Sequence, residues 1–162
     1  MISIILITLI TLVIDQTSKY LILLNMKEFE SIPIINNFFK VTFMKNTGAA
    51  FSFLEGNVPL IIIVTSIIII FILRYIKTTN PKRQEKIFYS LIIGGAFGNL
   101  IDRIVYGYVI DFLDFNLFGY NYPVFNVADI SIVVGIFSLV ILSIIESRSE
   151  YETNRTRIIK NR

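Results

Sequence analysis

Carboxylates are the side chains of this chain best suited to hydrolytic chemistry. The 162 residues include no Cys and no His. Thiol nucleophiles, Ser-His-Asp triads, HExxH zinc sites and haem ligation by imidazole are therefore excluded. Paired carboxylates or a Ser-Lys pair would have to activate the attacking group. We expect no metal and no cofactor.

Two acidic motifs occur late in the chain. VIDFLDF contains Asp111 and Asp114, and FNVAD contains Asn126 and Asp129. The second motif also fits a helix start, because Asn is a favoured N-cap and an acid three residues later suits the helix dipole. Capping and catalysis both remain open for Asp129 at this point.

Two further polar clusters interrupt apolar segments, where ionisable residues are costly. DQTSK puts Asp15 and Lys19 at i and i+4, the spacing of a helical ion pair. GNLIDR puts Asn99, Asp102 and Arg103 on one helical face, preceded by glycines at 94, 95 and 98. Small residues allow close helix approach, so the Asn and an Asp-Arg pair can hydrogen bond across the interface. Structural and substrate-binding roles are both open for these clusters.

The elements that must position these residues are membrane-spanning. The chain is 54% hydrophobic and 17% charged, with a mean hydropathy of +0.71. Apolar segments at 2–24, 58–73, 87–106 and 128–145 approach the length that crosses a hydrocarbon core. We expect one integral membrane domain over 1–162, and we read the first segment as a retained helix because it lacks a basic n-region and a cleavage motif.

Lys and Arg indicate the orientation. They concentrate in the loop 74–86 and in the tail 146–162, which we therefore assign to the cytoplasm. The tail is expected near anionic lipid, and the net charge of +3 gives no reason to invoke nucleic acid. The connections 25–57 and 107–127 then lie outside. In the first, alternation over 39–44 predicts a strand, followed by a turn at Asn46 to Gly48.

This orientation brings every unusual polar motif to one membrane face. The first and third helices run outward and carry their polar residues toward the outer end, whereas the fourth runs inward from Asn126 and Asp129. Unrelated structural features would not be expected to converge in this way. A functional site at the outer membrane surface is therefore predicted.

The set of motifs resembles the lipoprotein signal peptidases (signal peptidase II), bacterial inner-membrane aspartic peptidases. The matching stretches are DQTSK (15–19), KNTGAAFS (45–52), GNLIDR (98–103), VIDF (109–112) and FNVAD (125–129). Each is weak alone, but five in the family's order are specific. The resemblance implies four transmembrane helices with a small extracytoplasmic β-cradle.

The resemblance also implies the roles of individual residues. Asp111 and Asp129 would be the catalytic pair; from the residues alone, Asp114 competes with Asp111. The supporting residues would be Asp15, Lys19, Asn46, Gly48, Asn99, Asp102, Arg103 and Asn126. The implied substrates are prolipoproteins with a diacylglyceryl group on the lipobox cysteine, cleaved just before that residue. Globomycin-like inhibitors are implied as ligands, and we expect a monomer in contact with membrane lipid.

Two close carboxylates would share one proton at neutral pH. The ionised member can then deprotonate a water while the protonated member polarises the scissile carbonyl. Because Asp129 begins a helix, we expect it to be the base and Asp111 the acid.

Three other hypotheses about the function compete with that of a carboxylate peptidase. A small proton-coupled transporter would need carboxylates at the membrane midplane that line a path to both faces. A Ser-Lys peptidase would use Ser18 and Lys19, but adjacent helical residues point about 100° apart. A purely structural protein would tolerate Asn at positions 111 and 129.

Overall fold

The computed structural model describes residues 2–48, 55–117 and 119–160, with only the backbone described for 152 and 154–160. Within these ranges there are four long helices, α1 (Ile2–Asn25), α2 (Val58–Thr79), α3 (Arg83–Tyr106) and α4 (Val127–Lys160). Each is long and apolar enough to cross a membrane. Four strands accompany them: β1 (Ser31–Ile35), β2 (Phe39–Asn46), β3 (Val109–Leu117) and β4 (Tyr120–Asn121). The predicted fold class is confirmed.

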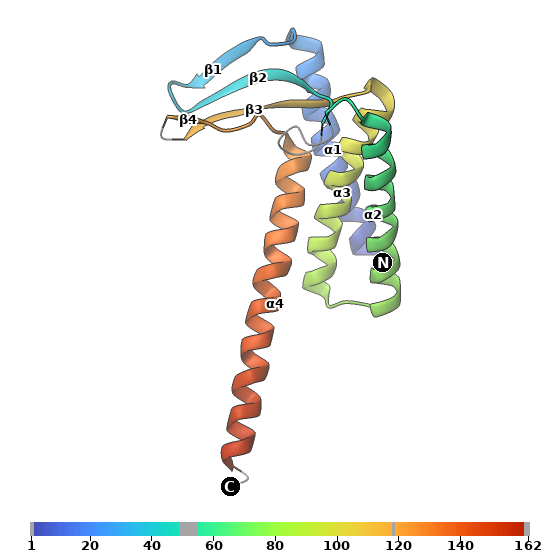
Figure 1. Ribbon diagram of the computed structural model, residues 1–162, viewed down its shortest axis with the longest axis vertical. Coiled ribbons are helices and arrows are strands. Elements are labelled where there is room, and N and C mark those ends of the chain that lie inside the picture. Colours follow the sequence, from blue (N-terminus) through green and yellow to red (C-terminus); the bar gives the residue numbers. More distant parts are fainter. Residues whose placement is uncertain (1, 49–54, 118, 161–162) are drawn as a thin grey trace.

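The sheet lies across one end of the helices (Figure 1). Its strands are antiparallel in the order β1-β2-β3-β4. The strand predicted over 39–44 is confirmed as part of β2, although its alternation is broken at Thr42 and Phe43, where the register with β3 shifts. We call this end of the bundle the sheet end. The opposite end, where a short loop joins α2 to α3 and where α1 begins, is the loop end (Figure 1).

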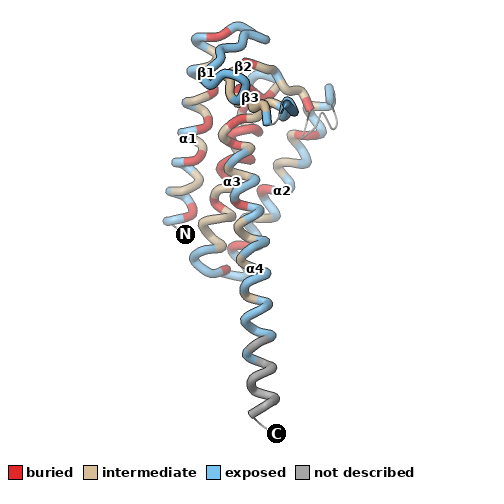
Figure 2. Tube along the Cα trace, turned by 90° about the vertical axis from the view of Figure 1, so that its left-hand side faces the viewer, coloured by how far each residue is buried: buried red, intermediate tan, exposed pale blue. Residues whose placement is uncertain are grey.

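Helix α3 is the centre of the bundle. Of its apolar membrane-spanning stretch 56% is buried, against 22% in α1, 17% in α2 and 11% in α4. Buried residues accordingly gather on α3 and beside the sheet (Figure 2). The glycines of α3 explain the close contacts: a Cβ on Gly95 would collide with the carbonyl of Ala128 in α4, and one on Gly98 with the Asp15 carboxylate of α1.

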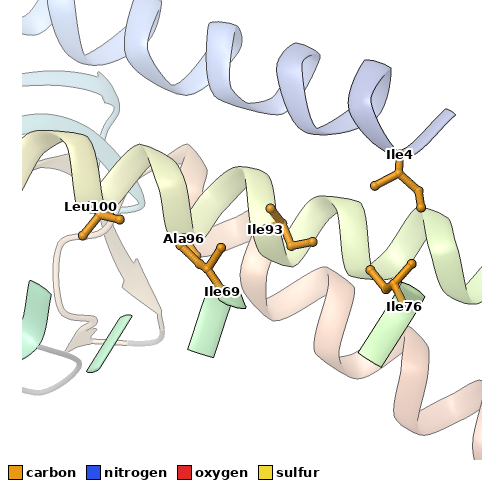
Figure 3. Close-up of a cluster of buried hydrophobic side chains, with 6 residues drawn as sticks. All are labelled: Ile4, Ile69, Ile76, Ile93, Ala96 and Leu100. Atoms are coloured by element: carbon orange, nitrogen blue, oxygen red, sulfur yellow. The ribbon is translucent and has the colours of Figure 1, made fainter. Parts of the chain in front are cut away.

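Apolar side chains from α1, α2 and α3 hold the bundle together below the sheet. Figure 3 shows the cluster, all of whose members are 8% exposed or less: Ile4, Ile69, Ile76, Ile93, Ala96 and Leu100. Because lipid tails are as apolar as these residues, van der Waals packing is the main attraction here. The large apolar residues on the other helix faces are exposed and form the lipid-facing surface.

The helices extend beyond the apolar segments at the loop end. Helix α2 has a proline in its first turn and ends at Thr79, before the capping residue Asn80, whose φ of 46° is left-handed. It therefore includes Arg74 and Lys77, beyond the apolar segment 58–73. Helix α4 has 34 residues, which gives a length of about 51 Å at 1.5 Å per residue. Since a hydrocarbon core is only about 30 Å thick, the last turns of α4 lie outside it.

Candidate active site

Lys19 is the centre of a buried charge cluster between α1 and α3. Its ammonium lies 2.8 Å from Asp15 Oδ2 and 2.9 Å from Asp102 Oδ2, and it donates to Asn99 Oδ1 at 2.8 Å. The Lys19 side chain is 1% exposed and both carboxylates are fully buried. The ion pair predicted from the i, i+4 spacing of Asp15 and Lys19 is confirmed, and Asp102 joins it from the neighbouring helix.

The same two carboxylates also hold the elements that carry the other acids. Asp15 Oδ1 accepts the backbone N–H of Ala128, in the first turn of α4, at 2.8 Å. Asp102 Oδ2 accepts the backbone N–H of Ile110, in β3, at 3.2 Å. A charged acceptor strengthens such hydrogen bonds. The cluster around Lys19 therefore fixes the positions of β3 and of the start of α4.

Asn126 and Asp129 form a reciprocal cap at the start of α4. Asp129 N donates to Asn126 Oδ1 at 3.0 Å, and Asn126 N donates to Asp129 Oδ2 at 3.1 Å. This is the capping box that the spacing predicted. The second oxygen, Asp129 Oδ1, accepts from Asn99 Nδ2 at 2.8 Å. The carboxylate is thus fixed both by its own helix and by α3.

Asp111 faces this cap from β3. Its Oδ1 accepts from Asn126 Nδ2 at 2.6 Å, and its Oδ2 accepts from Asn46 Nδ2, in β2, at 2.9 Å. Burial, together with the nearby Asp129 carboxylate, raises the pKa of Asp111 from 3.8 to about 7. The side chain is 2% exposed. Asp111 is consequently a carboxyl group that can hold a proton at neutral pH.

Asn126 joins the two acids through one side chain. Its amide contacts Asp111 through Nδ2, while its Oδ1 accepts from the Asp129 backbone. It also donates to Asn99 Oδ1 at 3.1 Å, which links the acids to Lys19. Two carboxyl groups that both contact Asn126 can divide general-acid and general-base roles between them.

Arg103 differs from the expectation of an Asp-Arg pair. Asp102 pairs with Lys19, whereas Arg103 donates to the carbonyls of Gly48 at 2.6 Å and Asn99 at 3.3 Å. Neighbouring positions on a helix point about 100° apart, so the two side chains diverge. Arg103 is 8% exposed, and its Nε has no hydrogen-bond partner among the residues that the structure describes.

Asp114 lies on a different contact network from Asp111. It accepts from Thr42 Oγ1 at 2.8 Å and lies 3.2 Å from Lys40 Nζ. Lys45 also has a local partner, Glu28, at 2.8 Å. Of the two acids in VIDFLDF, only Asp111 reaches Asn126.

All ten residues predicted for the site belong to one connected set of contacts. They come from α1, β2 and the turn after it, α3, β3 and α4: Asp15, Lys19, Asn46, Gly48, Asn99, Asp102, Arg103, Asp111, Asn126 and Asp129. Residues 49–52 of KNTGAAFS lie outside the described residues. Sequence reasoning missed Gln16, which donates to Asp102 Oδ1 at 2.8 Å. Its position within DQTSK was the available signal.

These features define a class: a multi-pass membrane protein with a pair of adjoining carboxyl groups beneath a small sheet, as in a membrane peptidase of the aspartic type. The family model described as signal peptidase (SPase) II matches residues 7–145. The chain therefore belongs to the signal peptidase II family.

Known relatives agree with this assignment. The chain is 45% identical to the lipoprotein signal peptidase of Halothermothrix orenii over 83% of this chain and 90% of that protein. It is 43% identical to that of Staphylococcus epidermidis, over 84% and 85%. A bacterial membrane enzyme solved at 2.3 Å by the in meso method superposes with a TM-score of 0.84, at 35% identity, over 90% of this chain and 89% of that one.

Proposed function

We propose that this protein is an aspartic endopeptidase that removes signal peptides from diacylglyceryl-modified prolipoproteins. It cuts just before the lipidated cysteine, with Asp111 and Asp129 as the catalytic pair. Membership of the signal peptidase II family supports the activity. The observation that supports the choice of residues is the contact of Asn126 with both carboxyl groups.

The pKa of Asp111, raised to about 7, supports a division of roles. Protonated Asp111 donates a hydrogen bond to the scissile carbonyl, while ionised Asp129 takes a proton from a water that attacks the carbonyl carbon. Transfer of the Asp111 proton to the carbonyl oxygen completes a gem-diol. This gem-diol collapses as Asp111 takes back a hydroxyl proton and Asp129 gives its proton to the leaving nitrogen, which breaks the C–N bond and returns the pair to its starting protonation. No covalent intermediate with the enzyme is required.

The surroundings of the pair suit a lipid-bearing substrate. Phe115 stacks on Phe39 at 4.5 Å and on Phe125 at 5.7 Å, on the sheet face that carries Asp111. An apolar surface beside a polar point matches a peptide whose cysteine carries acyl chains. We infer that the sheet end faces the extracytoplasmic side of the bacterial cytoplasmic membrane. The segment 74–86, which the structure forms from the ends of α2 and α3 and the short loop between them, and the tail 146–162 then lie in the cytoplasm, from the excess of Lys and Arg there.

Cleavage by purified protein tests the function. A diacylglyceryl-modified prolipoprotein should be shortened by the wild type, with a product that begins at the lipidated cysteine by mass spectrometry, and the same protein without its lipid should remain intact. Asp111→Asn and Asp129→Asn should each lower kcat by about 10³-fold or more, the range of general acid-base catalysis. Glu146→Gln, an acid at the loop end, is the matched control and should cleave normally.

Near-normal cleavage by either Asn variant would exclude the proposed pair, and absence of cleavage by the wild type would exclude the activity. By family resemblance, globomycin should inhibit the reaction, and the protein should act as a monomer.

The orientation can be tested separately because the chain contains no Cys. Single cysteines at Asn36, in the β1–β2 turn, and at Thr79, at the end of α2, should react with an impermeant maleimide from opposite sides of the membrane. Labelling of both from the same side would contradict the topology.

A further inference from the structure

Asp114 is a buried acid that the proposed mechanism does not use. Its side chain is 8% exposed and lies on β3, three residues after Asp111. Successive side chains of a strand alternate between the two sheet faces, so Asp111 and Asp114 point to opposite faces. The contacts agree, because Asn126 reaches Asp111 whereas Thr42 and Lys40 reach Asp114.

A β-bulge interrupts β2 between the residues that pair with these two acids. Val41 pairs with Leu113 and Met44 pairs with Asp111, so two residues of β2, Thr42 and Phe43, lie opposite Phe112 alone. Thr42 contacts Asp114, and Phe43 packs with Met26 and Ile110. Both bulge residues therefore lie on the sheet face opposite to that of Asp111.

The bulge determines which way Asn46 points. With regular alternation from Val41, Asn46 would lie on the face opposite to that of Asp111, because one residue more or less exchanges the faces of all that follow. The extra residue returns Met44 and Asn46 to the Asp111 face, and Asn46 pairs with Val109 and donates to Asp111 at 2.9 Å. The hydrogen bond from Asn46 thus depends on the bulge.

We propose that Asp114 is a positioning residue that fixes the bulge of β2 and so keeps Asn46 directed at Asp111. The proposal rests on the proposed function. Asp114 holds the first bulge residue through the Thr42 hydroxyl, and that hydroxyl also lies 2.8 Å from Ser31 Oγ in β1. One carboxylate consequently ties three strands together at the irregular point, while Lys40 pairs with it at the more exposed edge.

The pH dependence of cleavage separates this role from a merely structural one. The hydrogen bond from Asn46 lowers the pKa of Asp111, against the effects of burial and of Asp129. Losing it should move the alkaline limb of the kcat profile upward by about one pH unit, because a hydrogen bond to a charged group is worth about that much. Asp129 and Lys19 also act on Asp111, and Arg103 is near it; all three are kept in every variant.

The experiment compares Asp114→Ala, Asn46→Ala and the double variant, using lipidated prolipoprotein as substrate. Each single variant should move the alkaline limb upward and lower kcat by about tenfold, with KM within about twofold of wild type. The double variant should resemble either single one, because both remove the same contact. Thr42→Val should reproduce Asp114→Ala and covers the case in which that variant does not fold.

Conservative variants provide the matched controls. Asp114→Asn keeps an oxygen that can accept from Thr42, and Thr42→Ser keeps the hydroxyl, so both should stay close to wild type. Lys40→Met removes only the more exposed ion pair and should also cleave normally.

An unchanged alkaline limb in Asp114→Ala and Thr42→Val, or a double variant whose shift is the sum of the two, would overturn the positioning role. If Asp114→Asn abolished cleavage while Asp111→Asn retained it, Asp114 itself would be the catalytic acid. A wild type that does not cleave would refute the proposed function instead.

Discussion

The two ends of the helical bundle hold charged side chains in opposite ways. At the sheet end, Lys19 and its two carboxylate partners are at most 1% exposed, and each charge of this cluster has several partners. At the loop end, Lys82 and Glu146 lie 2.6 Å apart, but they are 67% and 36% exposed. The Lys19 cluster and the Lys82–Glu146 pair both contain short contacts, yet water surrounds only the second. Burial, and not the contact distance, should therefore decide which ion pair affects the stability of the protein.

Removing the central cation at the sheet end should have the largest effect on stability. Lys19→Met leaves Asp15 and Asp102 buried without a counter-ion, which costs about 3–5 kcal/mol for a broken buried pair. Thermal unfolding in detergent measures the loss, with Lys82→Met at the loop end as the matched control. Equal melting temperatures for the two variants would contradict the comparison.

Two glycines allow close helix contacts in different surroundings, one beside a buried carboxylate and one in apolar packing. A Cβ on Gly98 would meet the Asp15 carboxylate, whereas one on Gly135 would meet Ile92 and the carbonyl of Phe88. Gly98→Ala and Gly135→Ala should each destabilise the protein by about 1–3 kcal/mol through overpacking. Cleavage at a temperature where both are folded should fall only for Gly98→Ala, because only that glycine adjoins the Lys19 cluster. A loss of kcat in both would mean that the site depends on packing throughout the bundle.

The pH dependence of kcat should come from acids at the sheet end, and acids at the loop end should not affect it. With the pKa of Asp111 raised to about 7, its proton is present below that pH and lost above it, so kcat should fall about tenfold per pH unit on the alkaline side. Measured pH profiles of wild type and Glu146→Gln should coincide. A profile that stays level to pH 9 would show that cleavage does not need the Asp111 proton.

The smallest effect is expected for the exposed ion pair. Glu146→Gln removes the partner of Lys82 at the loop end, but solvent and salt already screen such pairs. Its melting temperature should equal that of the wild type, at low and at high salt. A clear decrease at low salt would show that the loop end contributes more than its exposure suggests.

Much of this arrangement could be predicted from residue spacing. The i, i+4 pair of Asp15 and Lys19 and the cap formed by Asn126 and Asp129 are local, so helical geometry alone defines them. The partner of Asp102 could not be predicted, because it depends on how α1 and α3 are rotated about their axes. The bulge at Thr42 could not be predicted either, because the alternation over 39–44 is typical of a regular strand. Its consequence for Asn46 emerges only from the pairing of β2 with β3.

The cap at the start of α4 links catalysis to local opening of the chain. The amide of Ala128 is held by Asp15 and that of Asp129 by Asn126, so fraying of this first turn would also release Asp129. Local unfolding of a helix end is ordinarily a low-energy event. Here the slow exchange of two backbone hydrogens would report, residue by residue, how long the carboxyl pair remains assembled.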